Sequence, residues 1–145
     1  MTAALELAAV MIAAAFTSAA FYINFVEHPA RMKLPIGAAL TQWKPAYQAG
    51  FVMQATLAVL GGGAALGAAW LNGDTRWAIG GVLLIANWPY TLIVILPLNN
   101  KLMAIAPESA NEEARAMLER WNALHAGRTA LGALAAIVLS WAALT

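Results

Sequence analysis

The stretch that decides the fold is GFVMQATLAVLGGGAALGAAWLNGDTRWAIGGVLLIANWPYTLIVIL, residues 50–96. It holds two long apolar runs, from about Gly50 to Leu71 and from about Trp77 to Leu96, with the polar tetrapeptide Asn72-Gly73-Asp74-Thr75 between them. A run of about 20 apolar residues is long enough for a helix that crosses the hydrocarbon core of a bilayer. An Asn-Gly-Asp sequence is typical of a tight turn. The stretch therefore predicts two transmembrane helices joined as a hairpin.

Two further apolar runs flank this hairpin. The first covers residues 2–26 and carries one charge, Glu6; it has no basic residue before Arg31, so we interpret it as a retained span and not as a signal peptide. The last covers residues 129–144. Between the hairpin and the last run, apolar side chains recur at spacings of three and four with charges on the other faces, which is typical of an amphipathic helix at a membrane interface.

These patterns predict an all-α fold in a single domain, residues 1–145. We expect an integral membrane four-helix bundle with an additional amphipathic interfacial helix before the last span. The expected spans are about residues 3–28, 48–71, 77–97 and 126–144, and the amphipathic helix covers about residues 107–125. Glycines such as Gly61, Gly62 and Gly63 predict close helix packing, within one chain or in a homo-oligomer.

The composition supports a membrane protein and excludes several functions. Of the 145 residues, 62% are hydrophobic and 10% are charged, which is far from the average of soluble domains. The absence of cysteine excludes disulfides, thiolate nucleophiles and cysteine-ligated metal centres. A net charge of +1 with scattered cations gives no basic surface for nucleic acid.

The distribution of basic residues predicts the orientation in the membrane, because basic residues in short loops tend to stay in the cytoplasm. With four spans, only Arg76 falls on one side, and seven basic residues fall on the other: Arg31, Lys33, Lys44, Lys101, Arg115, Arg120 and Arg128. We therefore predict an inner-membrane or plasma-membrane protein with both termini on the non-cytoplasmic side. We interpret Arg31, Lys33 and Arg115 as topology and headgroup residues, and Trp43, Trp70, Trp77 and Trp141 as interfacial tryptophans.

Polar residues inside the spans predict a site, because an unsatisfied polar group in hydrocarbon is costly. They occur on all four spans or at their ends: Asn24, Glu27, His28, Gln54, Asn87, Trp88, Tyr90, Asn99, Trp121, His125 and Arg128. On the predicted topology nearly all lie at the cytoplasmic ends of their helices, and Asn87 lies deeper. We therefore expect one polar pocket that opens toward the cytoplasmic interface.

The residue types leave several roles open for this pocket. His28, His125 and Glu27 are the ligand types of a mononuclear transition metal site, and the two histidines are also the ligand type of a haem. Without a metal, a histidine can act as general base while amide and indole donors stabilise an oxyanion. A plainer interpretation is that these groups end helices or join them by hydrogen bonds.

Five motifs resemble the anthrone oxygenase-like family of small four-span membrane proteins, in the same order and over nearly the whole chain. They are Glu27-His28-Pro29-Ala30-Arg31, Trp43-Lys44-Pro45-Ala46-Tyr47, Ala86-Asn87-Trp88-Pro89-Tyr90-Thr91, Pro97-Leu98-Asn99-Asn100-Lys101 and Arg120-Trp121-Asn122-Ala123-Leu124-His125-Ala126-Gly127-Arg128-Thr129. Fungal relatives oxidise an anthrone to an anthraquinone, so the resemblance implies an oxygenase-like oxidoreductase with molecular oxygen as co-substrate and a lipophilic aromatic or quinone-like substrate.

The resemblance and the chemistry together suggest the site residues. The catalytic candidates are His28, His125, Glu27 and Asn87, the first three of which are also the metal candidates. The substrate-binding candidates are Asn24, Gln54, Trp88, Tyr90, Asn99, Arg120, Trp121 and Arg128. Two other classes of function remain open: a non-catalytic module that binds or transports a ligand, and a structural membrane subunit.

Overall fold

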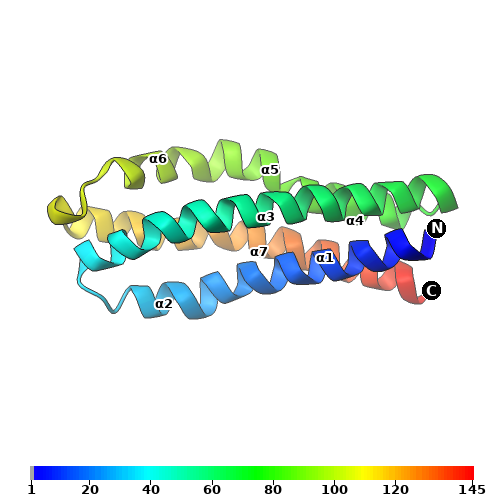
Figure 1. The fold of residues 1–145 in the computed structure, drawn as a ribbon, viewed down its shortest axis with the longest axis horizontal. Coiled ribbons are helices and arrows are strands. Elements are labelled where there is room, and N and C mark those ends of the chain that lie inside the picture. The colour runs from blue at the N-terminus through cyan, green and yellow to red at the C-terminus, as the bar shows by residue number, and fades with distance from the viewer. Residues whose placement is uncertain (1) are drawn as a thin grey trace.

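The computed structural model describes residues 2–145, which form helices joined by short connections and contain no strand within that range (Figure 1). Before residue 105 the chain forms three helical stretches. The first comprises α1 (Thr2–Tyr22), the π-helix η1 (Ile23–Glu27) and α2 (His28–Arg31). The second is α3 (Ile36–Asn72). The third comprises α4 (Thr75–Ile85), α5 (Asn87–Tyr90), the π-helix η2 (Thr91–Ile95) and α6 (Leu96–Ala104).

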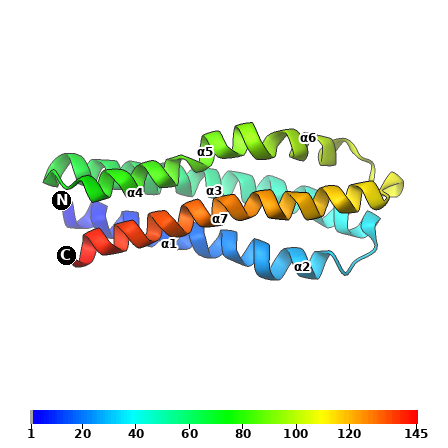
Figure 2. The same ribbon diagram turned by 180° about the vertical axis from the view of Figure 1, so that it is seen from behind.

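The chain closes with the short 3-10 helix η3 (Pro107–Ser109) and the long helix α7 (Glu112–Leu144). The first helix packs against α3 and α7, and α4 packs against the same two helices. Both ends of the chain lie at one end of the molecule, together with the turn before α4 (Figures 1 and 2). We call this the terminal end, and we call the opposite end, with residues 32–35 and 105–111, the loop end.

Four helical stretches are long and apolar enough to cross a membrane: Thr2–Arg31, Ile36–Asn72, Thr75–Ala104 and Glu112–Leu144, with 30, 37, 30 and 33 residues. The predicted all-α fold with four membrane-spanning helices is confirmed. By the length and composition of its helices the chain is an integral membrane protein.

The residues between α3 and α4 explain the conformation of the turn that joins these helices. Gly73 ends α3 with a positive φ of 76°, and its N–H donates to the Ala69 carbonyl at 2.9 Å. Asp74 caps α4 by accepting a hydrogen bond from the Arg76 backbone N–H at 2.9 Å. The Arg76 side chain also donates to this carboxylate and holds the pKa of Asp74 below its usual value. Beyond the turn the two helices touch closely, because a Cβ on Gly81 would lie 3.0 Å from the Gly62 carbonyl oxygen.

The bounds of two helices differ from the expected ones. We expected an amphipathic helix at 107–125 that could continue into a span at 126–144, and α7 is one continuous helix from Glu112 to Leu144. It contains no proline, and Asn111 caps it by accepting from the Glu113 and Ala114 N–H groups. Likewise α3 begins at Ile36 instead of about residue 48, with Pro45 inside the helix. The predicted spans began where the charged residues give way to apolar ones, whereas both helices begin before that point.

The third helix changes direction near its middle. It is interrupted at Ala86, three residues before Pro89, and passes through η2 before α6 begins. As a result α4 lies along α3, whereas α5 and α6 diverge from it toward the loop end (Figure 1). A π-helix, as in η1 and η2, is rare and frequently marks a functional site. Both π-helices contact α7.

The packing differs between the two halves of the molecule. In the terminal half the buried core consists mostly of alanines with a few large side chains such as Phe16 and Leu139. In the loop half the core contains two tryptophans, Trp43 and Trp121, with leucines and one isoleucine. Small residues let the helices of the terminal half approach closely, and the larger aromatic residues surround a space in the loop half.

Candidate functional site

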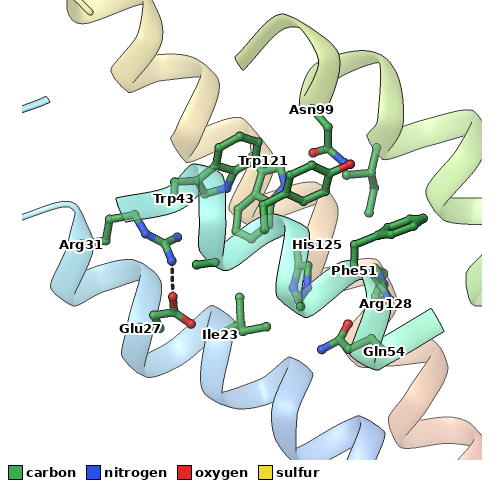
Figure 3. A pocket seen from close by; sticks show the side chains of 14 residues that line it. Ile23, Glu27, Arg31, Trp43, Phe51, Gln54, Asn99, Trp121, His125 and Arg128 are labelled. Atoms are coloured by element: carbon green, nitrogen blue, oxygen red, sulfur yellow. Dashed lines mark hydrogen bonds and ion pairs between the residues drawn. The ribbon is translucent and has the colours of Figure 1, made fainter. Parts of the chain in front are cut away.

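A small cavity lies in the loop half, between η1, α3, the η2–α6 segment and α7 (Figure 3). Its volume is about 30 Å³, which is room for about two water molecules. Aromatic side chains form much of its wall, namely Trp43, Tyr47, Phe51 and Trp121. Six of the predicted site residues also line it: Glu27, Gln54, Asn99, Trp121, His125 and Arg128. The four helical stretches therefore contribute to one buried polar and aromatic cavity.

His125 is held in one orientation by Asn24. The Asn24 amide nitrogen donates to the Asn122 backbone carbonyl at 2.9 Å and to the Asn122 side-chain oxygen at 2.7 Å. Because a backbone carbonyl only accepts, the other atom of the Asn24 amide, facing His125, is its oxygen. This oxygen lies 3.0 Å from His125 Nδ1 and also accepts from the Thr129 hydroxyl at 2.5 Å. His125 Nδ1 therefore carries the hydrogen, which leaves the lone pair on Nε2.

The free ring nitrogen of His125 is accessible from the cavity. Within residues 2–145, Nε2 makes no hydrogen bond, and it is not among the fully enclosed side-chain atoms. The imidazole stacks on the indole of Trp121 with ring centroids 4.9 Å apart. Trp121 in turn meets Trp43 edge to face at 5.7 Å, and Trp43 stacks on Tyr47 at 4.9 Å. A base is thus placed beside a wall of flat rings.

Glu27, Arg31 and Gln42 form an ion-pair network at one edge of the cavity, in which Arg31 is buried, Glu27 is half-buried and Gln42 is exposed. Arg31 donates through Nη2 to Glu27 and through Nε to the Gln42 side-chain oxygen. The Gln42 amide nitrogen donates to the same Glu27 oxygen at 3.2 Å. Arg31 is only 4% exposed. Our interpretation of Arg31 as a headgroup residue was therefore wrong, because its guanidinium neutralises Glu27 inside the protein.

Several polar atoms that line the cavity have no partner in the described part of the chain. Both side-chain atoms of Gln54, the Asn99 oxygen, the Arg128 Nε and the indole N–H groups of Trp43 and Trp121 are buried without a hydrogen bond. Buried polar atoms in proteins are nearly always paired, with protein groups or with bound molecules. Their concentration around one space indicates that water or a polar ligand occupies it.

A second, smaller space adjoins the first deeper in the protein. It has a volume of about 10 Å³, which is room for about one water molecule. Phe51 and Arg128 line both spaces. Asn87 lies here: its amide nitrogen donates to the Leu84 carbonyl at 3.1 Å, and its oxygen, like the Thr91 hydroxyl beside the same space, has no partner among residues 2–145. Trp88 also lines this space and donates to the Ala55 carbonyl at 3.3 Å.

The other predicted site residues lie outside the cavity lining. His28 is buried behind Trp121, with ring centroids 5.9 Å apart. Asn24 lies behind His125, and Tyr90 donates its hydroxyl to the Leu124 carbonyl at 2.8 Å. Arg120 is exposed on the surface of α7. Among residues 2–145, no three histidine, aspartate or glutamate side chains come together as a metal-ligand set, so Glu27, His28 and His125 do not form one.

Sequence reasoning missed several residues that line the site. Trp43, which we interpreted as interfacial, is fully buried. Tyr47 and Phe51 precede Gln54 on α3 at helical spacings of seven and three, and this shared face was a signal that the sequence already contained. The spacing of four between Glu27 and Arg31 was a second signal, since it is the spacing of a helical ion pair. Gln42 and Thr91 carry no comparable signal.

The fold and the cavity define a class of protein: a helical membrane protein with a pocket between its helices that combines a histidine, unpaired amides and aromatic rings. Comparison with known proteins adds the family. The anthrone oxygenase family matches residues 43–138, which is 96 of the 145 residues. The chain is also 30% identical, over 123 residues, to a protein named anthrone oxygenase from Claviceps purpurea (strain 20.1), with 73% of this chain and 67% of the relative covered. No solved structure matches the chain.

The chain belongs to the anthrone oxygenase family. The resemblance drawn from the five motifs is thereby confirmed. The matched region contains four of the motifs and leaves out the first, Glu27 to Arg31.

Proposed function

We propose that the protein is an oxygenase-like oxidoreductase that acts on a lipophilic aromatic or quinone-like molecule in the cavity around His125. One observation carries this proposal: a histidine with a free Nε2 faces a small cavity lined by Trp43, Tyr47 and Trp121. Aromatic side chains are suited to contact a flat aromatic substrate, and the family membership supports oxygen chemistry.

The proposed reaction is the oxidation of a methylene carbon that is activated by a carbonyl group on the same ring system, as in an anthrone. His125 Nε2 takes one proton from this carbon, which leaves an enolate. The anion reduces dioxygen and forms a C–O bond at the same carbon, which gives a hydroperoxide once a proton returns. Loss of water, with the second hydrogen of the carbon, leaves a carbonyl group. The methylene carbon loses four electrons, and one molecule of dioxygen gains four and ends as the new carbonyl oxygen and one water.

The residues around His125 have separate tasks in this proposal. Asn24 does not touch the substrate; it keeps the proton of the resting imidazole on Nδ1 and so keeps Nε2 basic. The unpaired donors of Gln54 and of the two indoles stabilise the enolate oxygen, because buried donors are costly without a partner and gain most from a charged one. Glu27 acts as the partner of Arg31 and keeps that cation neutralised.

We propose that the substrate enters from the bilayer. The cavity is too small for a tricyclic ring, so side chains must move before the ring can enter. Phe51 lines the cavity and also two outer grooves: one of about 390 Å³ with Ala55 and Trp88, and one of about 530 Å³ with Tyr47 and Met103. Rotation of this half-buried ring would connect the cavity with both grooves. The divergence of α6 from α3 supports an opening on this side.

The experiment is oxygen uptake by the purified protein with an anthrone as substrate. We expect His125→Phe, which keeps a ring against Trp121, to lower the rate by about 100-fold or more, since general-base catalysis contributes about 10² to 10⁴-fold. Lys101→Gln, an exposed change at the same end of the molecule, is the control and should keep the wild-type rate.

Two results would contradict the proposal in different ways. A wild-type rate in folded His125→Phe would remove His125 from catalysis, and a larger loss in His28→Phe than in His125→Phe would assign the base to His28. If the anthrone quenches the fluorescence of Trp43 and Trp121 but no oxygen is consumed, the protein is a binding or transport module and not an oxygenase.

A further inference from the structure

Arg128 is a buried cation without a partner in the part of the chain that the structure describes. It lies in α7, in one of the four membrane-spanning helices, and is 7% exposed. Its guanidinium donates no hydrogen bond to any of residues 2–145, and its Nε is enclosed. The face of Phe16 compensates part of the charge, with its ring centroid 5.6 Å from the guanidinium carbon, and the Tyr47 side chain lines the same cavity.

The charges around the cavity do not balance. Its lining contains three charged side chains when histidine is counted as neutral: Glu27, Arg31 and Arg128. Glu27 pairs with Arg31, so the charge of Arg128 is left over. A charge buried without a counter-ion destabilises a protein by several kcal/mol, and more so within a membrane, where it marks a functional group.

The surroundings of Arg128 indicate what would balance it. A guanidinium is planar and holds two oxygens of one group, or one ionised oxygen, in a fixed geometry. Gln54, which lines the same cavity, has both polar side-chain atoms unpaired, and aromatic rings form much of the remaining wall. The combination suits a flat aromatic molecule that carries a single negative oxygen.

We propose that Arg128 anchors an anion site and that the ligand of this cavity is held in ionised form, as an aromatic phenolate or enolate, before any oxygen is consumed. This inference rests on the proposed function for the place of the ligand, and it adds the charge of the ligand in the resting complex. A weak acid of this kind crosses the bilayer in neutral form and loses its proton inside the protein.

A structural role for Arg128 makes the opposite prediction about stability. If the guanidinium served only the fold, its removal would lower the melting temperature. If it serves to bind an anionic ligand, Arg128→Met removes an uncompensated buried charge. The ligand-free variant should then melt at a higher temperature than ligand-free wild type.

Alizarin, a dihydroxyanthraquinone, is a suitable probe because ionisation of its phenol shifts its visible absorption to longer wavelength. The dye is titrated with wild-type protein in detergent and, as reference, in the same detergent without protein. We expect the bound dye to show the anion spectrum, with its apparent pKa lowered by about one to three units, which is the usual effect of an adjacent opposite charge.

Three variants complete the test. Arg128→Met should lose the spectral shift and raise the melting temperature, and Arg128→Lys should keep the anion spectrum with weaker binding. Lys101→Gln also removes one positive charge, but from the exposed surface of the loop half, and should behave as wild type. The proposal is overturned if wild-type protein binds alizarin in neutral form or does not bind it, if the shift persists in Arg128→Met, or if that variant melts lower.

The anion site and the proposed function can fail separately. Wild-type protein that binds ionised alizarin but consumes no oxygen with an anthrone would retain the anion site and refute the oxygenase. Oxygen uptake together with dye bound in neutral form would support the oxygenase and refute the anion site.

Discussion

Asn24 shows at the scale of one residue how the site is organised. At the spacings of three and four that separate them, Asn24, Glu27 and His28 would share one face of a regular α-helix, yet they have different surroundings in the structure. Asn24 bonds to α7, Glu27 pairs with Arg31, and His28 lies behind Trp121. Because all three lie at or next to the π-helix η1, the ordinary spacing of an α-helix does not describe where they point.

Asn24 should determine the tautomer of His125. Asn24→Leu removes the acceptor at Nδ1, so the proton redistributes between the ring nitrogens, and we expect oxygen uptake to fall by about tenfold or more; a wrong tautomer in a serine protease costs about 10⁴-fold. Asn24→Asp keeps the acceptor oxygen and should retain more activity. The ¹⁵N chemical shifts of His125 measure the tautomer directly, and unchanged shifts in Asn24→Leu would contradict the assignment.

Sequence reasoning found some residues of the site and missed others for a physical reason. Gln54, Asn99 and His125 stood out because polar side chains are unexpected in apolar helices. Trp43 and Arg31 did not stand out, because tryptophan and arginine near the end of a span have an ordinary explanation at the membrane surface. Whether such a residue points inward depends on helix rotation, which one sequence does not specify.

At the scale of the element, α7 is central to the site because it places Trp121, His125 and Arg128 in the lining of the cavity. The sequence predicted that these residues share a face of the helix, since they recur at spacings of four and three. It left open whether the amphipathic helix continues into the last span, because the charges before residue 120 mark only where the apolar segment begins; in the structure the helix is continuous. Ala114, Leu118 and Trp121 of this segment are buried against the other helices, and such packing stabilises the helix beyond the apolar run.

Gly127 of α7 permits the close approach of Tyr90. A Cβ at this position would overlap the Tyr90 ring, with Cε1 at 3.0 Å, and would disturb the bond from the Tyr90 hydroxyl to the Leu124 carbonyl. We expect Gly127→Ala to destabilise the protein by about 1–3 kcal/mol, as overpacking usually does. Gly63→Ala is the matched control, because nothing lies within 4 Å of the Cβ it would add. The control should melt at or above the wild-type temperature, since alanine favours the helix; equal melting of both variants would refute the close packing.

At the scale of the whole molecule, the basic residues divide the protein into two ends. The helices bring Lys33, Lys44, Lys101 and Arg115 toward the loop end, while Arg76 lies next to the turn at the terminal end. Lys44 caps the end of α6 by donating to the Met103 and Ile105 carbonyls at 3.0 and 2.6 Å. From the excess of basic residues at the loop end we predict that this end faces the cytoplasm.

The orientation can be measured with single cysteines, because the natural sequence contains none. Thr145→Cys at the terminal end and Ser109→Cys at the loop end are both exposed positions. In intact cells a membrane-impermeant maleimide should label Thr145→Cys, and it should label Ser109→Cys only after the membrane is permeabilised. The reverse pattern would place the loop end outside the cell.

The two π-helices have a consequence for how such a protein can change. A π-turn holds one residue more than the α-turn it replaces, so each of η1 and η2 behaves as a single inserted residue. Because the extra residue is taken up within one turn, deleting it would leave the α-helices on both sides in register and convert the π-turn into an ordinary α-turn. The side chains of that turn, among them Asn24 and Glu27 in η1, would point in new directions while the rest of each helix stays in place. A change of one residue in length can therefore alter the pocket of this molecule without changing the fold around it.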